Sequence, residues 1–470
     1  MIDFEADTIQ CPVAQWARRM PELLAIDGAF GTFTYRKLDA LIRRRQQQLV
    51  DHGFKHEDVV GTWTDNGVDL IALIWACLRE GIPIAPVNPR FPADTVRDAL
   101  ALAGATAIFA PGRDAGFLPG INPTSTSPLD AVSHQLLQLD TIATIIFTSG
   151  STGRPKAALL TVRNHAANAA GSATNIALEP GDRWLLSLPL FHVGGLAILF
   201  RCFLVGATVV IPSRDESVSE AVSAHGVTHL SLVATQLRRW LDAPADIAVN
   251  QIAAVLLGGS AIPPNPIADA LKHGLPIHTS YGMTEMGSQI TTTKPGADIT
   301  ELQTSGYVLP HREVRIVGGR VQVRGATRFK GYLTEEGVEE PFDADGWFTT
   351  GDTGYFDEAG RLVVTGRSDD VFISAGENIQ PRVIEQALTS MPGILQAVVV
   401  PVADDEYGAR PVAFVDASGE IDQEQLRIEL RRTLPGLFIP VAYYELPEPN
   451  VGLKVSRQHL SERAEELRRP

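Results

Sequence analysis

The stretch Thr148–Lys156, which reads TSGSTGRPK, has the residue types of a phosphate-binding loop and follows an apolar run at 144–147. Gly150 and Gly153 permit backbone conformations that other residues avoid, so several N–H groups can turn toward one anion. Further donors are the hydroxyls of Thr148, Ser149, Ser151 and Thr152 and the amine of Lys156. The spacing differs from that of a Walker A loop. The stretch therefore predicts an anion site of another design, with a polar flexible loop as the alternative.

A second motif is Tyr281–Glu285, YGMTE, which follows a strand-like segment and ends in a hydroxyl and a carboxylate. Mg²⁺ prefers oxygen ligands and usually takes one or two carboxylates together with substrate phosphates. Glu285 is therefore a candidate metal ligand, and the alternative is a solvated surface carboxylate. Gly258 and Gly259 end another apolar strand, where they permit the close approach of a flat ring or form a tight turn.

Five further motifs occur along the chain. They are Leu188–His192 (LPLFH), Leu257–Ser260 (LGGS), Thr350–Asp352 (TGD), Gly366–Asp370 (GRSDD) and the late Lys454. Together they resemble the adenylate-forming superfamily, which includes acyl-CoA synthetases, peptide-synthetase adenylation domains and firefly luciferase. The resemblance covers nearly the whole chain. It implies an enzyme that uses ATP and Mg²⁺ to convert a carboxylate into an acyl-adenylate, and coenzyme A as the acceptor of the acyl group.

The resemblance also implies roles for single residues. Glu285 is the Mg²⁺ ligand, Thr284 contacts the α-phosphate and Tyr281 stacks on adenine. Asp352 accepts from the ribose hydroxyls, with the Arg367 donor fork nearby. The residues expected at ATP are Thr148, Ser149, Gly150, Ser151, Thr152, Gly153, Lys156, Gly258, Gly259, Ser260, Tyr281, Gly282, Asp352 and Arg367.

The C-terminal motifs imply a moving domain. In the superfamily a lysine at the position of Lys454 bridges the substrate carboxylate and the α-phosphate, where a fixed cation stabilises the charge that develops. Asp369 falls at the hinge about which the small domain swings after adenylation. Ser374, Ala375 and Gly376 then line the channel for coenzyme A.

Short apolar strands alternate with helical patterns through most of the chain, which predicts an α/β fold with a largely parallel sheet. Beyond Arg367 a smaller α+β pattern begins, in which Pro381 opens a helix. We expect the adenylate-forming fold, with a large α/β N-terminal domain at 1–367 that binds ATP and the acid. A small mobile α+β C-terminal domain at 368–470 is expected to carry Lys454.

Composition excludes several classes of function. The formal net charge of −15 opposes a general nucleic-acid or anionic-membrane binder. Three scattered cysteines form no disulfide or metal pattern, and the N-terminus lacks the features of a signal peptide, which fits the cytoplasm. The apolar run Val193–Pro212 contains Arg201 and three glycines, so it predicts a buried helix at 194–204 and a strand at 207–211, with no membrane span. Small molecules are the expected partners, and the oligomeric state stays open, a homo-oligomer included.

Some stretches resemble a narrower branch, the o-succinylbenzoate–CoA ligases of menaquinone biosynthesis. They are Leu185–Val193, Ser231–Leu237, Arg312–Val314, Val400–Asp404 and Leu453–Gln458. One residue separates Gly452 from Lys454, a spacing similar to that of bacterial members of this branch. The acid implied is 2-succinylbenzoate, which has two carboxylates.

Arg201 is the residue on which this substrate depends. A buried guanidinium without a partner is unfavourable, so Arg201 requires an anion. The resemblance implies that the anion is the aromatic carboxylate of the substrate, and the alternative is a protein Asp or Glu. His192 is implied to gate the acyl pocket, and the alternative is a packed core histidine.

Three rival functions remain. The first is a synthetase for another aryl or fatty acid, which would not need Arg201. The second is an enzyme that loads a carrier protein, although no carrier domain follows Lys454 in this sequence. The third is a protein that only binds these ligands, against which Glu285, Asp352 and Lys454 argue.

Overall fold

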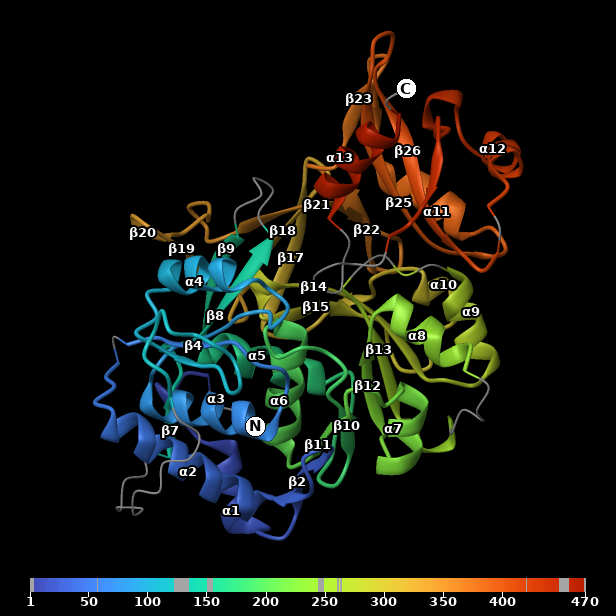
Figure 1. Ribbon diagram of the computed structural model, residues 1–470. Helices are drawn as coiled ribbons and strands as arrows, with labels where there is room; N and C mark the ends of the chain where they lie inside the picture. Colours follow the sequence, from blue (N-terminus) through green and yellow to red (C-terminus); the bar gives the residue numbers. More distant parts are fainter. Residues whose placement is uncertain are drawn as a thin grey trace.

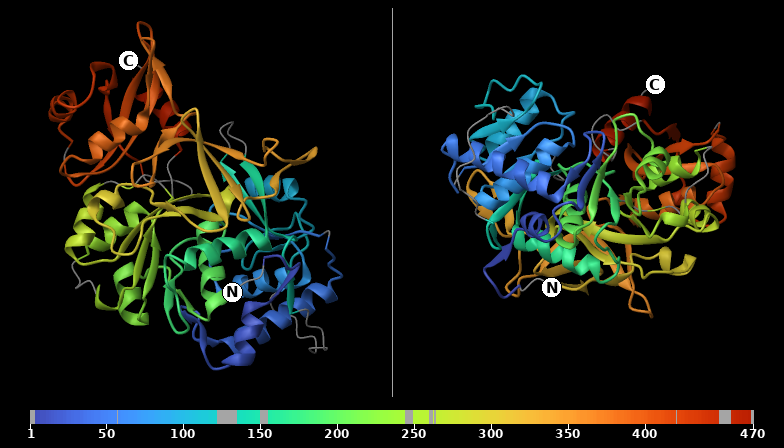
Figure 2. Two further views of the ribbon diagram at one scale, coloured as in Figure 1. Left: turned by 180° about the vertical axis from the view of Figure 1, so that it is seen from behind. Right: turned by 90° about the horizontal axis from the view of Figure 1, so that it is seen from below.

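The computed structural model describes residues 4–56, 58–121, 135–149, 155–243, 249–259, 262, 264–419, 421–447 and 456–468. Figure 1 shows two sheets and their helices in the lower part of the view, and a group of orange and red elements above them. The rear view in Figure 2 keeps this group at one end, beside the yellow-green helices.

In the described part of the chain, the largest sheet has nine strands in the order β16-β15-β14-β13-β12-β10-β11-β2-β3. Its central strands are parallel, and β3, β15 and β16 join antiparallel to their neighbours. The strands are β2 (Leu24–Gly28), β3 (Phe33–Thr34), β10 (Arg183–Leu185), β11 (Thr208–Ile211), β12 (His229–Leu232), β13 (Ala254–Leu257), β14 (Ile277–Met283), β15 (Ser288–Thr292) and β16 (Tyr307–Val308). Strands β12 and β13 are buried along their whole length, as parallel strands covered on both faces require.

A second sheet has seven described strands in the order β20-β19-β9-β8-β5-β4-β6. They are β4 (Val60–Thr62), β5 (Ile84–Pro86), β6 (Ala107–Phe109), β8 (Ile142–Ser149), β9 (Pro155–Thr161), β19 (Gly331–Thr334) and β20 (Gly337–Glu339). Strands β4, β5, β6 and β8 are parallel, whereas β9, β19 and β20 add an antiparallel edge. The prediction of a largely parallel sheet is therefore confirmed for the central strands, and hairpins add the antiparallel strands at the edges of both sheets.

Ten described helices belong to this larger part of the molecule. They are α1 (Pro12–Arg19), α2 (Tyr35–Asp51), α3 (Val68–Glu80), α4 (Ala93–Leu102), α5 (Val162–Ala173), α6 (Val193–Val205), α7 (Val218–His225), α8 (Ala234–Leu241), α9 (Pro264–Lys272) and α10 (Ile299–Leu302). Helix α5 contacts β9 of one sheet and β15 of the other, and it packs against α6. The helix and strand predicted at 194–204 and 207–211 are confirmed by α6 and β11. Among the described residues, none of the helices has both the length and the apolar composition that a bilayer crossing requires.

Toward the C-terminus the elements become hairpins and a small α+β arrangement. A four-stranded sheet contains β17 (Arg312–Val317), β18 (Arg320–Gly325), β21 (Phe348–Phe356) and β22 (Leu362–Arg367) among the described residues. The later elements are β23 (Phe372–Ser374), β24 (Glu377–Ile379), α11 (Pro381–Thr389), β25 (Ile394–Asp404), β26 (Gly408–Ala417), α12 (Gln423–Arg431), β27 (Tyr443–Glu445) and α13 (Arg457–Arg468). Pro381 occupies the first turn of α11, as predicted. The remaining pieces are the strand pair β1 (Thr8–Gln10) and β7 (Leu136–Gln138) and the short helices η1 (Val249–Gln251), η2 (Thr284–Met286) and η3 (Gly436–Phe438).

The hydrophobic clusters of this late segment contain described residues from Phe372 onward only. Its contacts with the larger part include a hydrogen bond of 3.1 Å from the Asn265 amide to the Thr389 carbonyl. The domain division at 367 and 368 stays a prediction.

Candidate active site

The two ends of the predicted phosphate loop lie on one β-hairpin. Thr148 in β8 pairs with Lys156 in β9, and Ser149 is the last residue of β8. Gly150, Ser151, Thr152 and Gly153 lie outside the described residues. The Lys156 ammonium lies 4.7 Å from the centre of the Tyr332 ring, which comes from β19. The hairpin therefore positions a cation at the base of the loop.

Glu285 lies in η2, directly after β14, and its side chain is buried. Its Oε1 accepts a hydrogen bond of 2.6 Å from the Tyr332 hydroxyl. Burial and the neighbouring Glu285 carboxylate raise the pKa of Tyr332, so this phenol stays a donor. Tyr332 thus contacts both Glu285, the predicted metal ligand, and Lys156. Sequence reasoning missed Tyr332, because no motif marks it.

Tyr281, Asp352 and Arg367 meet at the edge formed by β14, β21 and β22. The Tyr281 hydroxyl donates to Asp352 Oδ2 at 2.6 Å, and burial followed by the Asp352 charge raises the pKa of Tyr281. Arg367 lies 3.5 Å from Asp352 Oδ1 and 3.1 Å from Asp369 Oδ2. The site therefore brings together three of the residues predicted for the nucleoside, with the predicted hinge residue alongside.

Glycine is required at two of the predicted positions. A Cβ on Gly282 would lie 2.2 Å from the carbonyl oxygen of Ser288, so β14 and β15 can approach only without a side chain there. Gly259 has a φ of +84°, which favours glycine. Gly258 begins the same turn, and its Cβ would contact the Ser280 carbonyl at 3.3 Å. Ser260 lies outside the described residues.

His192 stands at the N-terminal end of α6, with its ring centre 4.5 Å from that of Phe191. The preceding loop is held by Asn66, whose amide donates to the Leu188 carbonyl at 3.0 Å. The same amide group accepts from the Leu190 N–H at 2.9 Å. Asn66 is a second residue that sequence reasoning missed, since it precedes the loop by more than a hundred positions.

Arg201 lies in the third turn of α6 and is 4% exposed. Its Nη2 donates to the Gln289 side-chain oxygen at 2.7 Å, and its guanidinium carbon lies 5.3 Å from the centre of the Trp184 ring. Within the described residues, Arg201 Nε has no hydrogen-bond partner and no carboxylate pairs with the guanidinium. Burial lowers the pKa of Arg201 to about 10. The protein anion considered as the alternative partner is therefore not found in the described part of the chain.

The predicted acceptor-channel residues form the turn of the β23–β24 hairpin. Ser374 is fully buried at the end of β23, and Ala375 and Gly376 are exposed with positive φ angles. Lys454 lies outside the described residues. Arg457 begins α13 three positions later and pairs with Asp370 at 3.1 Å and with Glu385 at 2.7 Å. Those two ion pairs attach the start of α13 to Asp370, beside the predicted hinge, and to Glu385 in α11.

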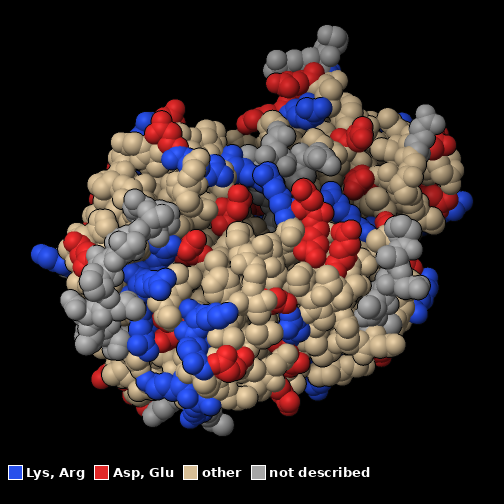
Figure 3. Space-filling model, turned by 60° about the horizontal axis from the view of Figure 1, so that its bottom comes forward, with Lys and Arg blue, Asp and Glu red and all other residues tan. Residues whose placement is uncertain are grey.

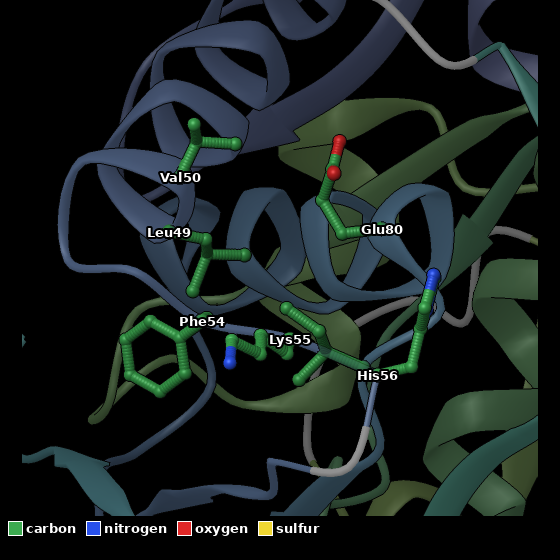
Figure 4. Close-up of a pocket in the computed structure, with 7 residues that line it drawn as sticks. Leu49, Val50, Phe54, Lys55, His56 and Glu80 are labelled. Carbon is green, nitrogen blue, oxygen red and sulfur yellow. The ribbon is translucent and has the colours of Figure 1, made fainter.

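Two cavities and the surface charge complete the description. One cavity of about 340 Å³ lies where α2 and α3 end and is lined by Leu49, Val50, Phe54, Lys55, His56, Glu80 and Ile82 (Figure 4). None of these residues was predicted for the site. Another cavity, of about 190 Å³, is lined in part by Asp369, Asp370 and Arg457. Figure 3 shows acidic and basic side chains interspersed over one face, and both kinds border a hollow in its upper part.

Family descriptions match both parts of this sequence. The description AMP-binding enzyme matches residues 13–333, and the description AMP-binding enzyme C-terminal domain matches residues 383–451. The chain belongs to the AMP-binding enzyme family. The 2-succinylbenzoate--CoA ligase of Bacillus licheniformis is similar to this member of the family, with 32% identity over 470 residues that cover 95% of this chain and 98% of the relative.

Solved structures from the AMP-binding enzyme family have the same fold. The o-succinylbenzoate CoA synthetase of Bacillus subtilis with the acyl-adenylate intermediate OSB-AMP has a TM-score of 0.89 and 29% identity, covering 97% of this chain and 98% of that chain. The Bacillus subtilis enzyme in complex with ATP and magnesium ion has a TM-score of 0.85 and 29% identity, covering 93% and 96%. The expected adenylate-forming fold is confirmed.

Proposed function

We propose that this chain is an ATP-dependent 2-succinylbenzoate–CoA ligase of menaquinone biosynthesis. The observation that carries the proposal is Arg201, a buried guanidinium to which no carboxylate of the described residues is paired. A substrate with a second carboxylate supplies the missing anion, and an arginine can bind it in a bidentate manner. The similar ligases of known name support the same substrate.

The reaction has two half-reactions. In the first, an oxygen of the succinyl carboxylate forms a bond to the α-phosphorus of ATP, and the bond from that phosphorus to pyrophosphate breaks. In the second, the sulfur of coenzyme A forms a bond to the acyl carbon, AMP leaves and the thiol proton is released. Positioning and electrostatic stabilisation carry most of the catalysis in such a scheme.

The nucleotide roles follow the geometry of the candidate site. Tyr281 and Asp352 would receive the adenosine, while Lys156 and Thr284 would contact phosphate oxygens. The Glu285 carboxylate fits an Mg²⁺ ligand, because it is buried, is oriented by Tyr332 and has no Lys or Arg paired with it among the described residues. When bound, Mg²⁺ would supply positive charge beside the phosphates.

Different residues of the C-terminal segment would act in the two half-reactions, one after the other. Residues 368–470 would move as a unit about Asp369, bringing Lys454 to the carboxylate and the α-phosphate for adenylation. The hairpin with Ser374, Ala375 and Gly376 would then line the path of coenzyme A. His192, at the start of α6, would stand at the entrance of the acyl pocket.

The test is CoA-dependent AMP formation with 2-succinylbenzoate, benzoate and a medium-chain fatty acid, on the wild type and on Arg201→Ala. We expect a strong preference for 2-succinylbenzoate, and a loss of about 10²- to 10⁴-fold in kcat/KM for it in the variant, since removing the partner of a buried charge costs about 3–5 kcal/mol. The control is Arg239→Ala, which removes an exposed arginine of α8 and should change neither the substrate preference nor kcat/KM. If the enzyme acts on a monocarboxylate and Arg201→Ala does not change that activity, the family assignment holds but 2-succinylbenzoate is refuted as the substrate.

A further inference from the structure

Gln289, in β15, holds the guanidinium of Arg201 by a neutral contact. The Arg201 Nη2 atom donates to Gln289 Oε1 at 2.7 Å, and both residues are buried. This is an unusual partner for a buried arginine, because a neutral amide orients the guanidinium without compensating its charge.

The orientation of the Gln289 amide follows from its two contacts. Its Nε2 donates to the Thr292 hydroxyl at 2.6 Å. The guanidinium of Arg201 can only donate, so the Gln289 atom that it contacts must be an acceptor, which leaves the amide nitrogen to donate to Thr292. The oxygen of the amide must therefore face Arg201, and the assignment does not depend on a choice between amide nitrogen and oxygen.

A second buried arginine, Arg312, also converges on Gln289. Its Nη1 donates to the main-chain carbonyl of Gln289, its Nε to Pro310 at 2.9 Å and its Nη2 to Asn168 at 3.4 Å. These three acceptors are neutral carbonyl oxygens. Gly171 makes room for the guanidinium, since a Cβ there would lie 2.0 Å from Nη2. Burial and the positive charge of Arg201 lower the pKa of Arg312 to about 9, so the two cations repel each other.

Two buried guanidinium groups beside one neutral residue create a positive potential that no described carboxylate cancels. We propose that Gln289 determines selectivity for a substrate with a second carboxylate, by orienting Arg201 while leaving its charge available to that carboxylate. Arg312 adds a second positive charge beside Gln289. This inference rests on the function proposed above, and it assigns to Gln289 a positioning role that acts through Arg201.

The site is also connected to the nucleotide motif. Gln289 pairs with Gly282 across β14 and β15, where no side chain fits between the strands. A substrate carboxylate at Arg201 would therefore bind beside β15, the strand that pairs with Gly282 and Met283 of the YGMTE motif.

The experiment compares two acids on Gln289→Glu, with ATP and coenzyme A saturating. One acid is 2-succinylbenzoate, and the other is 4-oxo-4-phenylbutanoate, which lacks only the ring carboxylate. Glutamate has nearly the shape of glutamine but would pair with Arg201. We expect kcat/KM for 2-succinylbenzoate to fall about 100-fold, equivalent to about 2.7 kcal/mol, mainly through KM. For 4-oxo-4-phenylbutanoate it should change less than about threefold.

Two further variants separate charge and structure. Gln303→Glu adds the same charge at an exposed position and should keep the wild-type preference. Gln289→Met removes the acceptor without adding a charge. It should raise KM for 2-succinylbenzoate about tenfold, as expected for the loss of a hydrogen bond to a charged group, and leave the other acid unaffected.

The outcomes distinguish the two proposals. A wild type that does not prefer 2-succinylbenzoate overturns the proposed function itself. A wild type with that preference, combined with a Gln289→Glu variant that keeps it, overturns the role of Gln289 alone. Equal losses for both acids in Gln289→Glu and Gln289→Met would also overturn it, because they would show a purely structural role.

Discussion

At the residue scale, the distinctive feature is a set of buried polar side chains that contact one another across distant strands. Arg201 meets Gln289, and Glu285 meets Tyr332. In each pair one member carries a charge and the other is a neutral residue that orients it. Such second contacts fix the geometry of charged groups that act on ligands.

Replacing Tyr332 by Phe tests the second pair. The variant keeps the ring that lies beside Lys156 but removes the hydroxyl that orients Glu285. We expect the apparent affinity for Mg²⁺ to fall about tenfold, measured as the magnesium dependence of ATP–pyrophosphate exchange. Tyr355→Phe, at an exposed tyrosine, is the control. An unchanged magnesium dependence in Tyr332→Phe would show that Glu285 is oriented without this hydroxyl.

The sequence predicts one member of each pair and misses the other. Glu285 stands in a motif, and Arg201 attracts attention as a charge within an apolar run. Gln289 and Tyr332 lie in ordinary strands, 88 and 47 positions from their partners. Their roles arise from the strand pairing that brings them there, and pairing between distant strands leaves no local pattern in the residues.

At the element scale, the hairpin β23–β24 turns through two residues with positive φ, Ala375 at 48° and Gly376 at 84°. Two such residues in a two-residue loop form the type I′ turn that matches the twist of the strands. Alanine is strained in this conformation by about 1–2 kcal/mol, whereas glycine is not. The hairpin that is proposed to line the acceptor channel therefore stores strain at Ala375.

Ala375→Gly should relieve this strain and raise the free energy of unfolding of the C-terminal segment by about 1 kcal/mol. The measurement is urea unfolding followed by amide hydrogen exchange of residues in β23 and β24. Ala359→Gly, at an exposed turn alanine of the larger part that has no positive φ, is a control that should lower the stability of that part by a few tenths of a kcal/mol and leave exchange in β23 and β24 unchanged. A loss of stability in Ala375→Gly would show that the turn is not strained.

The elements are predicted to different degrees. The apolar runs identify α6, β11 and the central parallel strands, because burial on both faces requires continuous apolar sequence. The antiparallel strands β9, β15 and β19 are not distinguished from parallel ones by composition. Their direction is set by the hairpins around Thr148–Lys156 and Tyr281–Thr292. Those hairpins carry much of the site, so the edges of the sheets were the harder part to predict.

At the scale of the whole molecule, stability should depend on His165, which is buried between the two sheets on α5. Its Nε2 lies 2.9 Å from the Thr144 hydroxyl, and its ring stacks on Phe200 at 4.7 Å. Burial lowers its pKa from 6.5 to about 3. Between these values the unfolded chain binds a proton that the folded chain excludes, so the free energy of unfolding decreases as the pH falls below about 6.5.

In His165→Gln, the proton that the unfolded chain binds at this position is no longer taken up on unfolding. Between pH 6 and pH 4 the free energy of unfolding of the wild type should therefore fall more steeply than that of the variant, by about 1.4 kcal/mol per pH unit. The measurement is urea unfolding across that range. His273→Gln replaces an exposed histidine and should retain the wild-type slope. Equal slopes for His165→Gln and the wild type would mean that His165 is protonated in the folded protein.

The proposed movement of residues 368–470 predicts that Lys454 serves only one half-reaction. Lys454→Ala should lower the rate of adenylate formation about 10³-fold, since a unit charge pair at ~4 Å is worth about 4 kcal/mol. Transfer from added acyl-adenylate to coenzyme A should change little. Equal losses of rate in both half-reactions would contradict the proposal that different residues of this segment serve the two half-reactions.

The central claim is tested most directly by identifying the product. The protein is incubated with ATP, Mg²⁺ and 2-succinylbenzoate, first without coenzyme A and then with it, and the acyl species are followed by mass spectrometry. The account predicts 2-succinylbenzoyl adenylate and pyrophosphate in the first stage, followed by the thioester and one AMP per thioester in the second. Pyrophosphate release that does not depend on 2-succinylbenzoate, or an adenylate that coenzyme A does not consume, would contradict it.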